Sequence, residues 1–235
     1  MQKRRFSVVM SKAEIIGGFC FFLFYLLLLN PLLQLFLTKV LHQELTSLRL
    51  NLWFYSVCIF FTVLLFHRFL WGSLRALRQN RRRVLRSTAV CLLLYGALTI
   101  LVTALVFWLL PNFTNQNNDA IISLLDQNPA FVCVLAIVLA PIIEECLFRG
   151  LIFGNLRRSS RLLAYVVTAL GFSAIHVIGF LGASSPLEIA LSALQYVPAT
   201  LVLCGLYEYA DNIWSPILLH ASINLITCLL WSVGF

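Results

Sequence analysis

The sequence predicts an all-α transmembrane helix bundle. Hydrophobic residues make up 61% of the 235 residues and charged residues only 11%, whereas a soluble domain has about 45–50% apolar and about 25% charged residues. The apolar residues form continuous runs of about 20 residues, the length that crosses a bilayer as a helix. These runs lack the alternation of transmembrane strands. We therefore expect a single transmembrane domain, residues 1–235, with about seven spans and a range of six to eight.

Polar connections separate seven apolar runs. The first run is too long for the apolar part of a signal peptide, which is about 7–15 residues, so we expect it to remain as an anchor. The expected spans are residues 15–37, 50–70, 88–110, 129–153, 162–181, 186–207 and 213–231. The first three are almost free of ionisable groups. We expect residues 1–128 to form an apolar scaffold and residues 129–235 to carry the functional helices.

Basic residues are concentrated in alternate connections and predict the orientation, while the connection between spans one and two carries only Lys39 and Arg49. Cytoplasmic loops of membrane proteins are enriched in Lys and Arg. Such residues gather before span one, between spans two and three and after span four: Lys3, Arg4, Arg5, Lys12, Arg68, Arg75, Arg78, Arg81, Arg82, Arg83, Arg86, Arg157, Arg158 and Arg161. We therefore expect a cytoplasmic N-terminus. The net charge of +8 then reports topology, and it does not indicate nucleic-acid binding.

Span four contains three ionisable residues, Glu144, Glu145 and Arg149. An acid at the centre of a membrane helix costs about 2.5 to 3.5 kcal/mol on insertion scales, so such residues are functional-site candidates. Glu145 and Arg149 are four residues apart and can form an ion pair on one helix face. Glu144 points elsewhere. It is the carboxylate left free to meet another helix, where it could act as a general base.

Spans five and seven each carry a histidine with a partner four residues away. These pairs are Phe172 with His176, and His220 with Asn224. Each pair lies on one helix face, so each helix can present a polar stripe to the interior. Pro141 and Pro216 favour kinks near these stripes. The site is therefore expected among spans four, five and seven, where two glutamates, two histidines and an asparagine could activate a water and stabilise an oxyanion.

Each polar group also has a purely structural interpretation. A membrane histidine is often an interhelical hydrogen-bonding group, and His220 with Asn224 could be only that. Glu145 with Arg149 is better explained as a structural ion pair than as a catalytic one. Glu144 has no local partner and is the hardest to explain structurally.

At these residues the sequence resembles the CAAX-protease and bacteriocin-processing (Abi) family of intramembrane proteases. The family's motifs are a Glu-Glu-x-x-x-Arg helix, a Phe-x-x-x-His helix and a His-x-x-x-Asn (or Asp) helix, in that order. The resemblance covers roughly residues 131–226. It implies hydrolysis of a peptide bond in a membrane-associated protein or peptide, with Glu144 and His176 activating the water. His220 and Asn224 would hold the oxyanion or help to bind a metal, and Glu145, Arg149 and Phe172 would support the site.

The cofactor is left open by the sequence. The family is commonly described as metalloproteases, and His176, His220 and Glu144 could together supply three zinc ligands. The His-Glu-x-x-His helix of other zinc proteases is not found in the sequence. We therefore expect a glutamate-dependent mechanism in which zinc could take part.

The resemblance also suggests biological settings. Eukaryotic members are associated with removal of the last three residues after a prenylated cysteine, and bacterial members with bacteriocin maturation and self-immunity. We expect a bacterial plasma-membrane protein with the latter role. Its partners would be the bilayer and a membrane-associated substrate, and no nucleic acid. The alternative is a non-catalytic scaffold or a transporter with a polar cavity.

Overall fold

The computed structural model describes residues 6–234, and helices dominate this part of the chain. Lys3, Arg4 and Arg5 of the expected cytoplasmic cluster lie outside the described residues. The elements are α1 (Lys12–Leu27), α2 (Leu29–Leu35), η1 (Phe36–Val40), α3 (Ser47–Leu109), α4 (Gln116–Gln127), α5 (Pro129–Val134), η2 (Leu135–Leu139), α6 (Ala140–Glu145), η3 (Cys146–Phe153), α7 (Gly154–Leu156), α8 (Arg161–Val177), η4 (Ile178–Phe180), α9 (Pro186–Ala210) and α10 (Trp214–Ser232). Within residues 6–234 the only β pairing is an isolated bridge, Leu181 with Ser184. The predicted all-α fold is confirmed.

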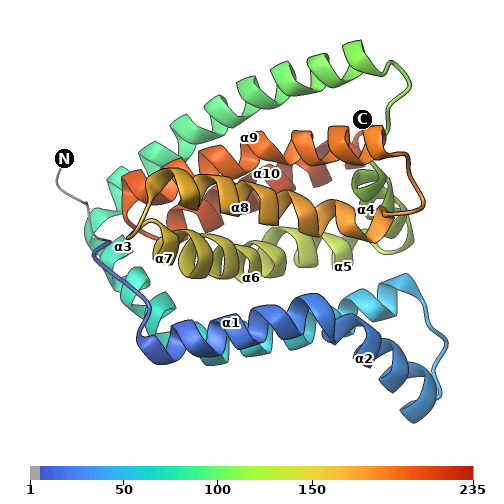
Figure 1. Ribbon diagram of the computed structural model, residues 1–235, viewed down its shortest axis with the longest axis horizontal. Helices are drawn as coiled ribbons and strands as arrows, with labels where there is room; N and C mark the ends of the chain where they lie inside the picture. The colour runs from blue at the N-terminus through green and yellow to red at the C-terminus, as the bar shows by residue number, and fades with distance from the viewer. Residues whose placement is uncertain (1–5, 235) are drawn as a thin grey trace.

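Helix α3 contains both the second and the third expected spans. It has 63 residues, about 95 Å at a rise of about 1.5 Å per residue, and Asn80 interrupts it with non-helical dihedral angles (φ −118°, ψ 22°). Both ends of α3 lie at the end of the molecule that holds α4, and its arginine-rich middle lies at the opposite end (Figure 1). Each half is long enough to cross a hydrocarbon core of about 30 Å.

The expected count of seven spans is not confirmed. Among the described residues, five helices are long and apolar enough to cross a membrane: α3, the helix Pro129–Leu156, α8 with η4, α9 and α10. A sixth is possible if α1 and the helix Leu29–Val40, which are bent by 56° to each other, form one broken span. The number of such helices is smaller than the number of expected spans because the arginine-rich connection between spans two and three is itself helical, so that both spans fall within α3.

The helix Pro129–Leu156 carries the first motif, and it alternates between α-helical and π-helical turns. Asn128 caps its start by accepting a hydrogen bond from the Phe131 N–H (3.2 Å). The π-helical turns η2 and η3 lie directly before and after α6, which contains Pro141, Glu144 and Glu145. Proline lacks an N–H and clashes with the carbonyl four residues earlier, and a π-helical turn is one way for a helix to accommodate this. Such turns occur frequently at functional sites.

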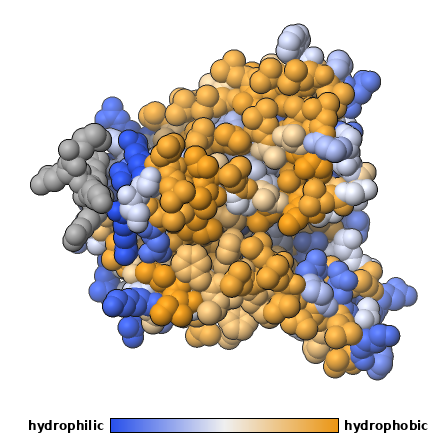
Figure 2. Space-filling view, viewed as in Figure 1, coloured by the Kyte–Doolittle hydropathy of each residue, from blue (hydrophilic) through white to orange (hydrophobic). Residues whose placement is uncertain are grey.

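The helices that carry the motifs lie inside the molecule. The helix Pro129–Leu156, α8, α9 and α10 lie between the two halves of α3, and α1 covers the first half (Figure 1). Hydrophobic residues cover the middle of the visible face, while hydrophilic residues gather toward its two ends (Figure 2). A band of this kind is expected where lipid tails are the solvent, so the structure is that of a multi-pass membrane protein.

A buried acid that the sequence analysis did not single out joins α1 to α3. The Glu14 side chain is 6% exposed and accepts hydrogen bonds from the backbone N–H of Phe69 (2.9 Å) and of Ser11 (2.7 Å). The Phe69 ring in turn lies against Gly150, where an added Cβ would be 3.1 Å from it. Glycine at position 150 therefore allows α3 to approach the helix of the first motif closely.

Candidate active site

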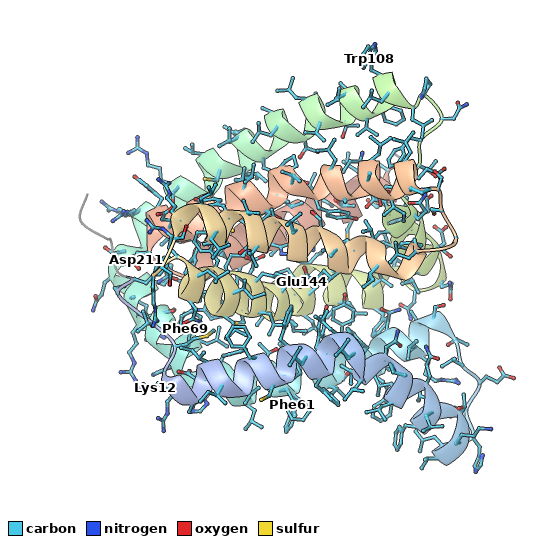
Figure 3. All side chains as sticks on the ribbon, in the orientation of Figure 1. Lys12, Phe61, Phe69, Trp108, Glu144 and Asp211 are labelled. Carbon is cyan, nitrogen blue, oxygen red and sulfur yellow. The ribbon has the colours of Figure 1, made fainter. Side chains whose placement is uncertain are left out.

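Polar residues of all three motifs line one cavity of about 450 Å³: Glu144 from α6, His176 from α8, and His220 and Asn224 from α10. Glu144 lies near the middle of the bundle (Figure 3). Phe172 lines the same cavity, whereas Glu145 and Arg149 lie behind it and are fully buried. The structure thus brings together the residues that the sequence analysis assigned to one site.

The buried Glu145 carboxylate connects two of the motif helices. Its Oε1 accepts hydrogen bonds from an Arg149 guanidinium nitrogen (3.0 Å) and from His220 Nδ1 (2.9 Å). The ion pair within the helix was predicted from the four-residue spacing, and it is confirmed. The bond to His220 was not predicted. It fixes the rotation of α10 relative to α6 and places the His220 ring at the cavity.

Arg149 lies against the aromatic ring of the second motif. Its guanidinium carbon is 4.3 Å from the centre of the Phe172 ring, a distance at which a cation and a ring face attract each other. The same ring lies 4.7 Å from the His176 ring and 6.1 Å from the His220 ring, between centroids. Phe172 therefore separates the buried ion pair from the cavity and packs against both histidines.

Glu144 is the carboxylate that the packing leaves free. Its side chain lines the cavity, and its buried Oε2 has no hydrogen-bond partner among residues 6–234. A buried carboxylate oxygen without a partner is costly. Glu145 Oε2 and two Arg149 nitrogens also have no partner among the described residues, but of these residues only Glu144 lines the cavity, where a water or a substrate could supply one. This arrangement agrees with the interpretation of Glu144 as the acid that has no local partner.

Both histidines have one ring nitrogen engaged. His176 Nδ1 lies 2.8 Å from the Phe172 carbonyl oxygen, and His220 Nδ1 lies 2.9 Å from the Glu145 carboxylate. Because these oxygens can only accept, Nδ1 is the donor in both rings, and in a neutral ring Nε2 is then unprotonated. Each histidine lines the cavity, and the bond at Nδ1 leaves Nε2 as its second ring nitrogen.

Asn224 replaces a hydrogen bond that Pro141 cannot make. In the π-helical turn η2 the backbone donates over five residues, as from the Ala140 N–H to the Leu135 carbonyl. The next such bond would run from residue 141 to Ala136, but proline has no N–H. Instead the Asn224 side-chain amide donates to the Ala136 carbonyl oxygen (2.6 Å). One amide hydrogen of Asn224 is therefore engaged, and the amide has a second hydrogen that it can donate.

Several cavity residues were missed by the sequence analysis. The Tyr196 ring stacks on His176 with centroids 4.2 Å apart, and its hydroxyl accepts from the Asn117 side-chain amide (2.9 Å). The Asn115 amide donates to Gln195 (2.8 Å). Two features of the sequence could have indicated these residues: the asparagine-rich segment 112–118, and the polar pair Gln195 and Tyr196 inside an otherwise apolar run.

The arrangement does not fit the possible zinc ligand set. Among residues 6–234, no group of three His, Cys, Asp or Glu side chains lies close enough together to hold a metal ion. His176, His220 and Glu144 share the cavity, but their side chains do not lie close enough together in this arrangement to act as three ligands.

Removal of the Glu145 carboxylate should destabilise the fold more than removal of the Glu144 carboxylate. Breaking a buried ion pair by deleting one partner costs about 3–5 kcal/mol, and Glu145→Ala leaves Arg149 buried without its partner. The measurement is the thermal stability and folded yield of Glu145→Ala and Glu144→Ala in detergent. Arg149→Met should partly rescue Glu145→Ala. Equal stability of the two alanine variants, or no rescue, would contradict the pairing.

Asn224→Ala should destabilise the protein by about 1–3 kcal/mol, because the Ala136 carbonyl loses its donor. Pro141→Ala supplies a backbone N–H that can take its place. The double variant should therefore lose less stability than the sum of the two single changes, as measured by thermal unfolding in detergent. Asn112→Ala, in an exposed turn, serves as the control. Additive losses would show that Asn224 and Pro141 act independently.

Comparison with known proteins identifies a family that matches part of the chain. Neither a curated protein nor a solved structure matches the chain. The family described as type II CAAX prenyl endopeptidase Rce1-like matches residues 126–226. All three motifs lie within this segment. The resemblance expected from the motifs is therefore confirmed: the part of the chain that carries Glu144, His176 and His220 matches the Rce1-like family of prenyl endopeptidases.

Proposed function

We propose that the protein is an intramembrane endopeptidase that uses a glutamate-activated water. The observation that carries the proposal is the Glu144 carboxylate, whose Oε2 has no hydrogen-bond partner among residues 6–234, in a cavity shared with two histidines that are each held through Nδ1. Proteolysis needs a group that takes a proton from water and donors for the oxyanion that forms. The family match supports a protease.

In the proposed mechanism Glu144 and His176 position a water against the carbonyl carbon of the scissile peptide bond. Glu144 takes one proton as the water oxygen bonds to that carbon, and the carbonyl oxygen becomes an oxyanion. The second amide hydrogen of Asn224 is a suitable donor to the oxyanion, on the side of the cavity that His220 also lines. Glu144 then returns the proton to the leaving nitrogen as the carbon–nitrogen bond breaks, leaving a carboxyl and an amine.

Glu145, Arg149 and Phe172 are proposed to position the reacting groups. Glu145 holds His220 through Nδ1, and Phe172 accepts at its carbonyl from His176 while its ring packs against Arg149. None of these three needs to contact the peptide. Their removal should act by displacing the histidines.

The proposed setting is a bacterial plasma membrane with the N-terminus in the cytoplasm. The arginines of the segment 75–86 and of the connection 157–161 support this orientation, because they lie at one end of the bundle, whereas Lys39 and Arg49 are the basic residues near the other end. The substrate is a membrane-associated protein or peptide. The family description favours CAAX-type processing of a prenylated protein, and the proposed bacterial setting favours peptide maturation or self-immunity. Parallel assays of a prenylated and an unprenylated membrane peptide distinguish these roles.

Glu144→Gln and His176→Ala should each reduce the cleavage rate by at least about 100-fold, the usual contribution of a general base or acid. Both variants should fold, because neither deletes a partner of the Glu145 network. The measurement is cleavage of both peptides by purified protein, followed by mass spectrometry. Glu44→Gln and His67→Ala change exposed residues outside the cavity and should keep wild-type rates. Retained cleavage by Glu144→Gln would remove Glu144 as the base.

Cleavage should survive removal of zinc. The reason is that the side chains of His176, His220 and Glu144 do not lie close enough together to hold a metal ion. The measurement is turnover after dialysis against a chelator, together with elemental analysis of the purified protein. Loss of turnover that added zinc restores would show that the metal takes part and that the ligands rearrange to bind it.

A further inference from the structure

The two ends of the bundle differ in charge. The arginine end contains the middle of α3, the connection 157–160 and the turn at Asp211, and contacts between its parts hold it together. Arg83 donates to the Tyr209 carbonyl oxygen (2.6 Å), and the Asn212 amide donates to the Ser73 carbonyl oxygen (2.7 Å). The opposite end, here called the α4 end, contains α4 and the turn 181–185 (Figure 1).

The candidate cavity extends from Glu144 toward the α4 end. Beyond the motif residues its walls carry uncharged polar side chains that lie at or near that end: Asn51, Thr103, Asn115, Asn117, Asn118 and Gln195. None of the residues that line it belongs to the arginine-rich segment 75–86 or to the connection 157–160. The polar path from the site therefore leads away from the arginines.

Apolar packing and ion pairs close the cavity on the side that faces the arginine end. The residues that follow Glu145 in the helix, Leu147, Phe148, Leu151 and Phe153, are fully buried. The Glu208 carboxylate lies beyond them and has three partners: the Arg157 guanidinium, the Arg161 guanidinium (3.2 Å) and the Tyr165 hydroxyl (3.1 Å). Among residues 6–234, this layer separates the site from the arginine end.

Helix α4 borders the mouth of the cavity. It is seen nearly end-on in Figure 1, across the direction of the long helices, and three side-chain hydrogen bonds tie its first turn and its cap to α9. These run from Asn115 to Gln195, from Asn117 to Tyr196 and from Ser192 to Gln116. Amide side chains of this kind can pair with the backbone of an extended peptide that replaces some of these bonds.

We propose that the substrate is a polypeptide segment exposed on the extracytoplasmic side of the membrane, which enters the cavity past α4. This inference rests on the proposed function, because the segment is a substrate only if the protein is a protease. It follows from two observations: the cavity leads to the α4 end, and the arginines mark the opposite end as cytoplasmic. A chain modified at a cytoplasmic C-terminus would have to cross the bilayer to reach Glu144 by this route.

The test is the sidedness of thiol labelling, and it needs no cleavage assay. Single cysteines are introduced into the full chain at Thr103 and Ala199, which line the cavity. Ser159→Cys, at the exposed connection of the arginine end, and Ala183→Cys, in the exposed turn of the α4 end, mark the two sides. A membrane-impermeant maleimide is applied to right-side-out and to inverted membrane vesicles, and the wild type, which has seven cysteines, gives the background.

The expected result is that Thr103→Cys, Ala199→Cys and Ala183→Cys react in right-side-out vesicles, while Ser159→Cys reacts in inverted ones. Labelling of the cavity cysteines together with Ser159→Cys would overturn the entry route. Labelling of Ser159→Cys in right-side-out vesicles would overturn the orientation. Cavity cysteines that react from neither side would show that water does not reach the site past α4. Each outcome is independent of whether the protein cleaves peptides.

Discussion

The buried Glu145 carboxylate is the interaction on which the site depends. One of its oxygen atoms receives hydrogen bonds from Arg149 on its own helix and from His220 on α10. A charge inside the bundle is tolerable only with a partner of good geometry, so the fold must keep α6, η3 and α10 in one relative position. Because Glu145 is occupied in this way, the neighbouring Glu144, about 100° around the helix, is left to face the cavity.

The backbone around this pair is adapted to it. Pro141 removes a hydrogen bond, the helix takes a π-helical turn before it, and Asn224 on α10 satisfies the carbonyl of Ala136. α10 is therefore fixed to the first motif helix at two points, through His220 and Asn224. Gly150 then lets the Phe69 ring approach closely, and Glu14 on α1 binds the Phe69 N–H. The apolar half of the chain thus supports the polar half.

Much of this site could be predicted from local spacing. The four-residue separations of Glu145 and Arg149, and of Phe172 and His176, fix neighbours on a helix without knowledge of the fold. Contacts between helices could not be predicted, because they depend on how each helix is rotated. For this reason the bond from His220 to Glu145, the bond from Asn224 to Ala136 and the stacking of Tyr196 on His176 were found only in the structure.

The count of spans shows a similar limit. Hydropathy located the apolar runs, but it does not reveal whether an arginine-rich connection is a loop or a helix, and in α3 it continues the helix as far as Asn80 and beyond. The roles of Glu144 and His176 in catalysis stay predictions, as does the division of the chain into scaffold and catalytic helices.

A single-turnover reaction in ¹⁸O-labelled water tests the central claim, which is that a carboxylate activates water for direct attack on a peptide bond. The protein is mixed in excess with an unlabelled membrane peptide, and the products and the protein are weighed by mass spectrometry. Our account predicts one heavy oxygen atom in the new carboxyl group of the product and none in Glu144. An unlabelled product with the label in Glu144 would instead show that the carboxylate attacks the peptide itself, and would contradict the account.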